Sequence, residues 1–501
     1  MKEKTSSNAP TDTELKKWQG SSVREKLVQL QSIFETTKDA KLHTIAIGSS
    51  HVSFFYLSSM AAEEKIYDEF IPKLINAGEK SIKSMLEAVD SANTGELQKV
   101  LSEIVSGKTA VFLNNEKQVY LITFRNKAKR SIEEPNSEHI IRGSHDGFIE
   151  DLESNMSILR YRIQNPDLTF EVMELGKKNK AKTAIAYLKT SYDPELLKEV
   201  KRRISYIDTE IMLTPGYLEE YIEDDPWSFF PQMLNSERPD RVISNLVDGR
   251  IALIMDGSPT VLIVPTTFFA FYQSTDDYNS RWISSTFIRL LRLASFIIAI
   301  NLPAFYISII GFHLEVIPQE LIVQMKNSVE GIPYPPIFEA MLMELTIELI
   351  REAGVRLPSP ISQTIGIVGG LVIGDAVVQA GLISNLMIVV VAVTAVSSYV
   401  VPSNEMSTTV RLLRFPLMIM ASIFGFLGMT FGVIFILVKL CKLESFGRPY
   451  FAPAAPFNLQ GLTDTFIRLP IWLKKEKSNK TGSGIFNKKK SSARGWEKNE
   501  N

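Results

Sequence analysis

Hydrophobic and polar positions divide the chain into two unlike halves. Up to about Trp282, short apolar runs alternate with charged stretches, whereas Ile, Leu, Val, Phe and Met dominate from Phe287 to Leu440. Short alternating runs predict strands and amphipathic helices, and long apolar runs predict membrane-spanning helices. We therefore expect a two-part α/β (or α+β) N-terminal region followed by an α-helical polytopic membrane domain.

The first 136 residues predict a lead and one α/β subdomain. Residues 1–40 are interpreted as a disordered lead with an amphipathic helix around Val23–Phe34. In residues 41–136, Leu42–Leu57 predicts one or two strands, and helical patterns follow from Glu63 to Ile104. The run TAVFLNNEKQVYLITF predicts a strand pair that turns at Asn114-Asn115.

Residues 137–283 predict a second α/β subdomain. Apolar residues share one face of Gly147–Ile163, which predicts a helix, and DPELLKEVKRRI predicts another that Asp193 caps. KTAIAYL and TEIML predict strands, and GRIALIMDGSPTVLIVP predicts a hairpin that turns at Asp256-Gly257. The alternation of strands and helices favours a partly parallel sheet.

Residues 284–448 predict a membrane domain with about four spans. The spans are Phe287–Phe312, Ile365–Ala380, Leu382–Val401 and Leu412–Leu440. Between the first two lies Ile337–Gly354, an amphipathic helix whose charges leave open whether it crosses the membrane. Residues 449–501 form a basic tail that we expect to be largely disordered.

Basic residues orient the predicted spans. Arg289 and Arg292 lie at the start of the first span, Lys439 and Lys442 follow the fourth, and the N-terminus lacks the apolar run of a signal peptide. The positive-inside rule then places both termini in the cytoplasm, which requires an even number of crossings. Arg411 and Arg414, placed at the far side of the fourth span, weaken this assignment slightly.

Composition excludes several classes of function. The 55 basic and 56 acidic residues give a net charge of −1, which argues against a dedicated nucleic-acid binder. One cysteine and five scattered histidines offer no metal cluster. The chain contains no nucleotide-binding glycine motif and no catalytic constellation, so we expect neither a cofactor nor enzyme activity.

The second predicted span, in the stretch SQTIGIVGGLVIGDAVVQAGLIS, separates into two stripes on a helical wheel. One stripe is a small-residue face suited to close helix packing, and it consists of Gly366, Gly370, Gly374 and Gly381. The other stripe predicts a pore wall, a hydrophobic constriction beside a carboxylate, and it consists of Val368, Val372, Asp375 and Gln379. The alternative is that the two polar side chains bond a neighbouring helix or lie near an interface.

The amphipathic helix Ile337–Gly354 carries a second acidic candidate. Glu344 and Glu348 fall on one of its faces, with Arg351 and Glu352 close by. The two carboxylates predict an acidic vestibule that concentrates cations. The alternative is an interfacial helix whose charges face water and pair with one another.

Several stretches, in order, resemble the A subunit of the GerA-type spore germination receptors. They are GFIEDLESNMSILRYRIQNPDL, DPELLKEVKRRISYID, ERPDRV, GRIALIMDGSPTVLIVP, EGIPYPPIFEAMLMELTIELIREAGVRLPSPI, IGIVGGLVIGDAVVQAGLIS and SFGRPYFAP. The ERPD motif is Glu237, Arg238, Pro239 and Asp240. The resemblance implies a multi-pass protein of the spore inner membrane with two partners, a transporter-like B subunit and a lipoprotein C subunit. It also implies a homo-oligomer, such as a pentamer, that forms a ligand-gated channel for monovalent cations.

Three other functions compete with the channel hypothesis. The chain could bind the nutrient itself, move a substrate as a transporter, or amplify the signal as a related A-like protein does. The inverted repeats of many transporters are not evident in the sequence. The sequence identifies neither the nutrient, nor the ion, nor the number of protomers.

Overall fold

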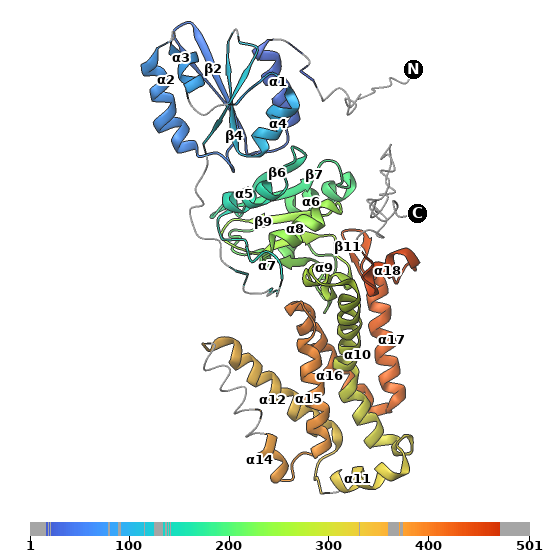
Figure 1. Cartoon of the computed structure of the whole chain (residues 1–501). Coiled ribbons are helices and arrows are strands. Elements are labelled where there is room, and N and C mark those ends of the chain that lie inside the picture. Colours follow the sequence, from blue (N-terminus) through green and yellow to red (C-terminus); the bar gives the residue numbers. More distant parts are fainter. Residues whose placement is uncertain are drawn as a thin grey trace, which may run out of the picture. The chain divides into compact units, whose positions relative to one another are not determined.

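A computed structural model describes residues 17–470, apart from residues 19, 21, 79–80, 89–91, 115, 125–133, 136–137, 139, 141, 330, 359–369 and 371–373. The chain divides into two compact units (Figure 1). Unit 1 comprises Met1–His139, Ser144–Ile222 and Asn235–Val264, and unit 2 comprises Ile140–Gly143, Glu223–Leu234 and Pro265–Asn501. The longest segment of unit 2 therefore begins at Pro265, and two short segments from earlier in the chain join it.

Unit 1 contains two five-stranded sheets with the same topology. The first has the order β1-β2-β4-β5-β3 and the second the order β6-β7-β9-β10-β8. Each half runs helix, hairpin, helices, short edge strand, helix, hairpin. The elements of the first half are α1 (Val23–Ile33), β1 (Ala40–Ile47), β2 (Ser50–Leu57), the π-helix η2 (Lys65–Phe70), α2 (Ile71–Ala77), α3 (Ile82–Ala88), β3 (Ala92–Thr94), α4 (Leu97–Val105), β4 (Lys108–Leu113) and β5 (Val119–Thr123). Those of the second half are α5 (Leu152–Arg162), β6 (Leu168–Leu175), β7 (Ala181–Leu188), α6 (Pro194–Ser205), α7 (Pro215–Ile222), β8 (Leu234–Ser236), α8 (Pro239–Val247), β9 (Ile251–Met255) and β10 (Val261–Val264).

The first sheet is packed by helices on both of its faces (Figure 1). Phe54 and Tyr56 of β2 join the cluster of η2, α2 and α3, whereas Phe55 and Leu57 join that of α1 and α4. Successive side chains of a strand point to opposite faces, so both faces of β2 are apolar. This explains why its sequence is a continuous apolar run rather than an alternating one.

Most predicted elements of unit 1 are present. The strand pair of β4 and β5 is confirmed, and so is the hairpin of β9 and β10, whose Gly257 has a φ of +87°. Asp193 caps α6 as predicted, because its side chain accepts a hydrogen bond from the Glu195 backbone. The predicted amphipathic helix near the N-terminus is α1, and Ser22 caps it.

One prediction for unit 1 is wrong, and another is not met where the direction of strand pairing is described. The pairs β6–β7, β7–β9 and β9–β10 are all antiparallel, so the partly parallel arrangement is not found in these pairs. Three helices and an edge strand separate β7 from β9, and the chain returns to the sheet in the opposite direction. The segment TEIML forms no strand, because the Asn179 side chain bonds both backbone polar groups of Met212 in place of a neighbouring strand.

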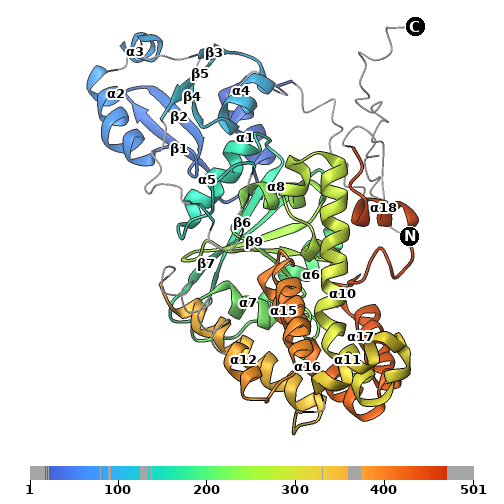
Figure 2. The same cartoon turned by 60° about the horizontal axis from the view of Figure 1, so that its bottom comes forward.

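Unit 2 is built around the long helix α10 (Trp282–Phe312), which contacts α15, α16 and α17 (Figures 1 and 2). Its core holds small and apolar residues of α10, α12, α15 and α16, among them Ala299, Ala340, Met387 and Met418. The other helices are α9 (Asp276–Asn279), α11 (Gln319–Val329), α12 (Pro336–Arg356), α14 (Gly374–Gln379), α15 (Asn385–Tyr399), α16 (Asn404–Phe424), α17 (Phe426–Lys442) and α18 (Leu459–Phe466). Short elements are the 3₁₀ turns η4 (Phe268–Tyr272) and η5 (Leu314–Val316), and the strand pair β11 (Glu444–Ser445) and β12 (Arg448–Pro449). The first part of the predicted disordered tail therefore carries a helix, α18.

The prediction of one span over Leu412–Leu440 is wrong, because this segment is two helices. Gly425, with a φ of +60°, ends α16, and α17 begins at the next residue. An added Cβ would overlap Met420 at Gly428 and Leu417 at Gly432, so the two helices pack closely and run antiparallel. Glycine permits both the turn and the close approach.

This reversal also corrects the position of two arginines. Leu413 of α16 and Lys439 of α17 line one groove, so α16 begins near the end of the bundle where α17 finishes. Arg411 and Arg414 therefore lie in the half of α16 nearer to the basic end of α17, not at its far side. The basic residues of α16 and α17 therefore lie toward the same end of the bundle, which the sequence did not suggest.

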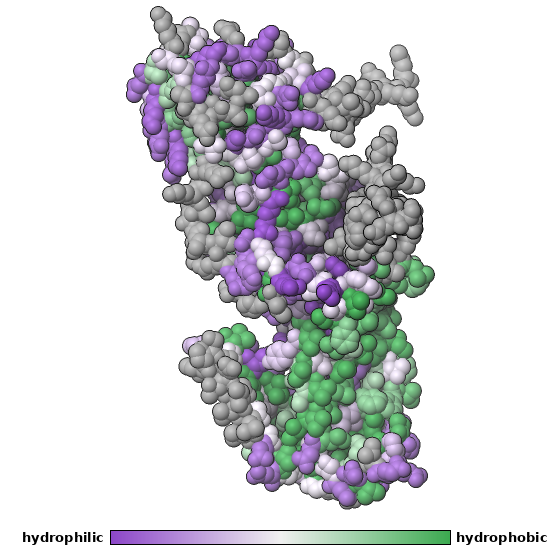
Figure 3. All heavy atoms as spheres, in the orientation of Figure 1, coloured by the Kyte–Doolittle hydropathy of each residue, from purple (hydrophilic) through white to green (hydrophobic). Residues whose placement is uncertain are grey.

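Two helices of the described chain, α10 and α16, are long and apolar enough to cross a membrane. The apolar helix α15 has 15 residues. On the face drawn in Figure 3, hydrophobic residues cover most of the bundle of unit 2. Of the predicted span Ile365–Ala380, residues 365–369 and 371–373 lie outside the described residues.

Candidate functional site

Two ion pairs join α12 to α16 inside unit 2, and we call this set the α12–α16 ladder. Glu344 pairs with Arg414, and Glu348 Oε1 lies 3.1 Å from Arg411 Nε. Glu344 and Glu348 are one helical turn apart, and so are Arg411 and Arg414. This spacing lets α12 and α16 form two ion pairs at successive helical turns.

The inner pair is buried and the outer pair is partly open. The side chains of Glu344 and Arg414 are 2% and 3% exposed, whereas those of Glu348 and Arg411 are 38% and 17% exposed. Arg414 Nε also donates to the Ala299 carbonyl of α10 at 3.0 Å. Removing one partner of a buried pair costs about 3–5 kcal/mol, because the other charge stays buried.

Arg351 extends the outer pair toward α15. Its guanidinium lies 4.3 Å from the centre of the Tyr399 ring and donates to Ser398 Oγ at 3.0 Å. One nitrogen lies 3.7 Å from Glu348. The polar face of α12 thus contacts both α15 and α16.

Glu339, near the start of α12, belongs to a second polar cluster. It is 1% exposed, and its Oε2 accepts a hydrogen bond from the Ser384 backbone at 3.0 Å. Ser384 caps α15, and its Oγ lies 3.0 Å from the Tyr306 hydroxyl of α10. Three helices therefore meet at this cluster, which sequence reasoning missed.

The two predicted vestibule residues lie on the ladder. In the described chain each carboxylate has an arginine partner, so neither is an unpaired negative charge. The partners are about 60–70 residues away in sequence. The predicted pairing within α12 is found between Glu348 and Arg351 and between Glu352 and Arg356. The one available signal was the presence of acidic residues on one largely apolar helix and basic residues on another.

The predicted pore wall is described only in part. Val368 and Val372 lie outside the described residues. Asp375 and Gln379 are exposed on α14, and Gln379 Nε2 donates to Asp375 Oδ2 at 2.6 Å. Their alignment one turn apart agrees with the helical wheel, and the pore assignment stays a prediction.

The predicted glycine face has no neighbour in this protomer where it is described. Gly366 lies outside the described residues. An added Cβ at Gly370, Gly374 or Gly381 would meet no atom within 4 Å. Gly381 has a φ of +64° and follows the end of α14, so it acts in a turn as well.

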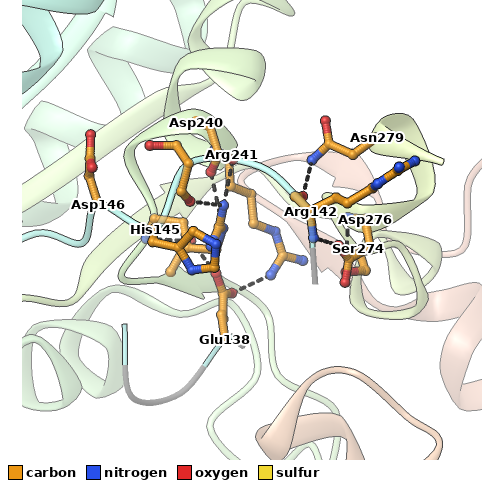
Figure 4. Close-up of polar contacts among 12 residues, drawn as sticks. Glu138, Arg142, His145, Asp146, Asp240, Arg241, Ser274, Asp276 and Asn279 are labelled. Atoms are coloured by element: carbon orange, nitrogen blue, oxygen red, sulfur yellow. Dashed lines mark hydrogen bonds and ion pairs between the residues drawn. The ribbon is translucent and has the colours of Figure 1, made fainter. Parts of the chain in front are cut away.

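The ERPD motif holds a segment of unit 1 in place (Figure 4). Arg238 is 1% exposed, and it donates to Asp240 Oδ2 at 2.6 Å and to the Ser144 carbonyl at 3.0 Å. Pro239 opens α8, and the Glu237 carbonyl accepts from Phe148 at 2.8 Å. Figure 4 also shows the pair of Arg241 and Glu138. These contacts give the ERPD motif a structural role in unit 1.

A buried charge cluster fixes the start of α10 within unit 2. Asp277 is 2% exposed and bonds both Arg289 Nε at 2.9 Å and Arg292 NH1 at 2.8 Å. The adjoining turn also contacts Arg142, since Asn279 Nδ2 donates to the Arg142 carbonyl at 2.7 Å (Figure 4). Arg289 and Arg292, on which the predicted orientation of the first span depends, therefore also stabilise the start of α10.

Comparison with known proteins assigns the family. Residues 28–480 match the family described as Bacillus/Clostridium GerA spore germination protein. Spore germination protein A1 of Bacillus subtilis is 41% identical over 430 residues, which cover 85% of this chain and 89% of that protein. Spore germination protein B1 of the same organism is 37% identical, covering 91% and 96%.

One solved structure is also similar. It is the crystal structure of the N-terminal domain of the A subunit of the Bacillus megaterium spore germinant receptor GerK3. It is 24% identical with a TM-score of 0.39, and the match covers 50% of this chain and 96% of that domain. The family match, which extends over most of the sequence, is decisive: this chain belongs to the GerA family of spore germination proteins.

Proposed function

We propose that this chain is the membrane subunit of a nutrient germinant receptor that oligomerises into a ligand-gated channel for monovalent cations. Its partners would be a transporter-like B subunit and a lipoprotein C subunit in the spore inner membrane. Both termini would face the cytoplasm, with unit 2 crossing the membrane several times. Val368, Val372, Asp375 and Gln379 would line the pore.

One observation carries this proposal. Gly370, Gly374 and Gly381 have open space where a Cβ would be, and the adjacent Asp375 and Gln379 are exposed. Glycine is unfavourable in a helix by about 1 kcal/mol, and close helix packing is the usual compensation in membranes. Since the described protomer supplies no close neighbour, another protomer is the natural source.

The α12–α16 ladder supports the same function. Charged side chains are costly within a bilayer and usually mark an ion path or a switch. The ladder fixes α12, which directly precedes the predicted pore segment. A movement of α16 relative to α12 would therefore be transmitted to that segment.

The channel is tested by replacing Val368 or Val372 with alanine in spores. A wider constriction should release potassium without nutrient. Val396→Ala is the matched control, because Val396 is 65% exposed on α15. Strictly nutrient-dependent potassium release in both pore variants would overturn the pore assignment.

A second candidate function is nutrient binding by unit 1. The observation that favours it is a cleft of about 740 Å³ lined by charged residues of both halves, including Lys41, Glu63, Asp151 and Lys182. Exchanging only unit 1 between receptors of different nutrient specificity tests this candidate. Specificity that follows unit 1 would favour binding over a purely channel-forming role.

A further inference from the structure

We propose that Glu339, Tyr306 and Ser384 form a binding site for one monovalent cation inside the helical bundle of unit 2. The site joins α12, α10 and α15, and it shares no residue with the predicted pore wall. The inference rests on the proposed function only in placing this bundle in a membrane.

Glu339 has one carboxylate oxygen free for a ligand. Its Oε2 is bonded by the Ser384 backbone, whereas its Oε1 is buried without a hydrogen-bond partner among the described residues. Tyr306 and Ser384 are 4% and 2% exposed, and their hydroxyl oxygens lie 3.0 Å apart. Three oxygen-bearing side chains thus converge at a place that solvent does not reach.

Among the described residues, no Lys, Arg or His side chain forms an ion pair with Glu339. The arginines of the neighbouring helices, Arg351, Arg411 and Arg414, gather around Glu344 and Glu348 instead. Residues 357–373, which follow α12 and are only partly described, contain no Lys, Arg or His. A buried carboxylate without a counter-charge is strongly unfavourable, so an added cation would be stabilising.

The N-terminus of α15 offsets only part of this charge. Ser384 caps α15, a helix of 15 residues, and the N-terminal end of a helix is equivalent to about half a positive charge. The remaining negative charge is less than one unit. That remainder matches a single monovalent ion better than a divalent ion, which usually has several carboxylate ligands.

The ligand atoms select the type of ion. A carboxylate and two hydroxyl groups are hard oxygen ligands, which suit alkali-metal ions rather than thiolate-binding metals. An ion at this position would tie α10, α12 and α15 together. Occupancy should therefore raise the stability of the bundle, since a ligand stabilises the state that binds it.

The test is thermal unfolding of the full-length protein in detergent micelles. Potassium or sodium chloride is compared with N-methyl-D-glucamine chloride at equal ionic strength and pH. The wild-type Tm should be higher, by on the order of 5 °C, in the alkali-metal salt. Glu339→Gln should remove this difference, because the amide keeps the shape but not the charge.

Two further variants keep the test independent of misfolding. Tyr306→Phe should retain the fold and raise the cation concentration needed for half of the effect. Glu352→Gln is the matched control, because this α12 carboxylate is 63% exposed and paired with Arg356; its response to cations should equal the wild type.

Four results would overturn the site. They are an equal wild-type Tm in both salts, a cation response that survives Glu339→Gln, stabilisation by magnesium or calcium alone, and a response to pH with none to alkali-metal ions, which would mean that Glu339 holds a proton. None of them bears on the pore variants, so this site and the proposed channel can fail separately.

Discussion

The two units each bury an arginine–carboxylate pair, and the pairs differ in how completely the carboxylate is bonded. In unit 1, Asp39 is fully buried and accepts from Thr37, from Ser59 and twice from Arg160, at 2.6–2.8 Å. In unit 2, Glu344 Oε1 has no hydrogen-bond partner among the described residues, and each arginine leaves one nitrogen unbonded there, NH1 of Arg160 and NH2 of Arg414. A saturated carboxylate fixes one geometry, whereas a partly bonded carboxylate leaves a smaller barrier to rearrangement.

This difference fits the position of each pair. Asp39 precedes β1 and Arg160 lies on α5, so the pair joins the two halves of unit 1. The Arg160 guanidinium also lies 5.0 Å from the centre of the Phe170 ring. Glu344 and Arg414 join two helices of the bundle that we propose to move during gating.

The largest effect is expected from Asp39→Ala. The substitution leaves Arg160 buried without its carboxylate and removes four hydrogen bonds, so unit 1 should lose about 3–5 kcal/mol of stability. Limited proteolysis and thermal unfolding of the full-length protein measure this loss. Lys83→Met is the control, since the Lys83–Glu116 pair is exposed and screened by solvent and should contribute little to stability.

A smaller loss of stability, with a functional signature, is expected from Glu344→Gln. The amide still accepts a hydrogen bond from Arg414, so the loss should be about 2–3 kcal/mol, near the low end for a broken buried pair. The double variant Glu344→Leu/Arg414→Met should recover stability while nutrient-triggered potassium release stays abnormal. If spores that carry the double variant germinate normally, the inner pair is only structural. The difference between the buried pairs of the two units then has no functional consequence.

Acid should weaken unit 1 through Asp39. Burial alone would raise the pKa of Asp39, but Arg160 and the hydroxyls of Ser59 and Thr37 outweigh it and hold the pKa below its usual value near 3.8. The unfolded chain therefore binds a proton first, and the stabilisation, complete above about pH 5, is lost as pH falls through the folded pKa. Unfolding followed between pH 6 and pH 2 should show this loss, and Asp39→Asn should lack it.

The smallest effect is expected from Glu348→Gln in the outer pair. The carboxylate is 38% exposed and partly screened by solvent, so stability should change by less than about 1 kcal/mol. Thermal unfolding of Glu348→Gln and Glu344→Gln, measured side by side, compares the stability lost at the outer pair with that lost at the inner pair. Equal losses in the two variants would mean that burial does not separate the two levels of the ladder.

Local features were predicted well from the sequence. The Asp193 cap of α6, the turn at Asp256-Gly257 and the helix around Glu344 each depend on residues a few positions apart. The acidic face of α12 was recognised for the same reason. Glu339 was missed because its importance comes from α10 and α15, not from its own helix.

Errors arose where distant packing decided the outcome. Gly425 reads as one more small residue in an apolar run, yet its positive φ divides the fourth predicted span into two helices. The alternation in TEIML is typical of a strand, but Asn179 satisfies the Met212 backbone and no strand pairs there. The arginine partners of Glu344 and Glu348 could not be assigned without knowing that α16 lies against α12.

The sequence by itself determined the division into an α/β region and an apolar helical region, because hydrophobic periodicity is a local property of the chain. It also determined the family, through motifs that need no coordinates. The tertiary structure alone decided the shared topology of the two sheets, the antiparallel hairpin of α16 and α17, and which buried charges have partners. Those properties depend on contacts between residues far apart in sequence, and the sequence does not show whether an arginine faces a given carboxylate.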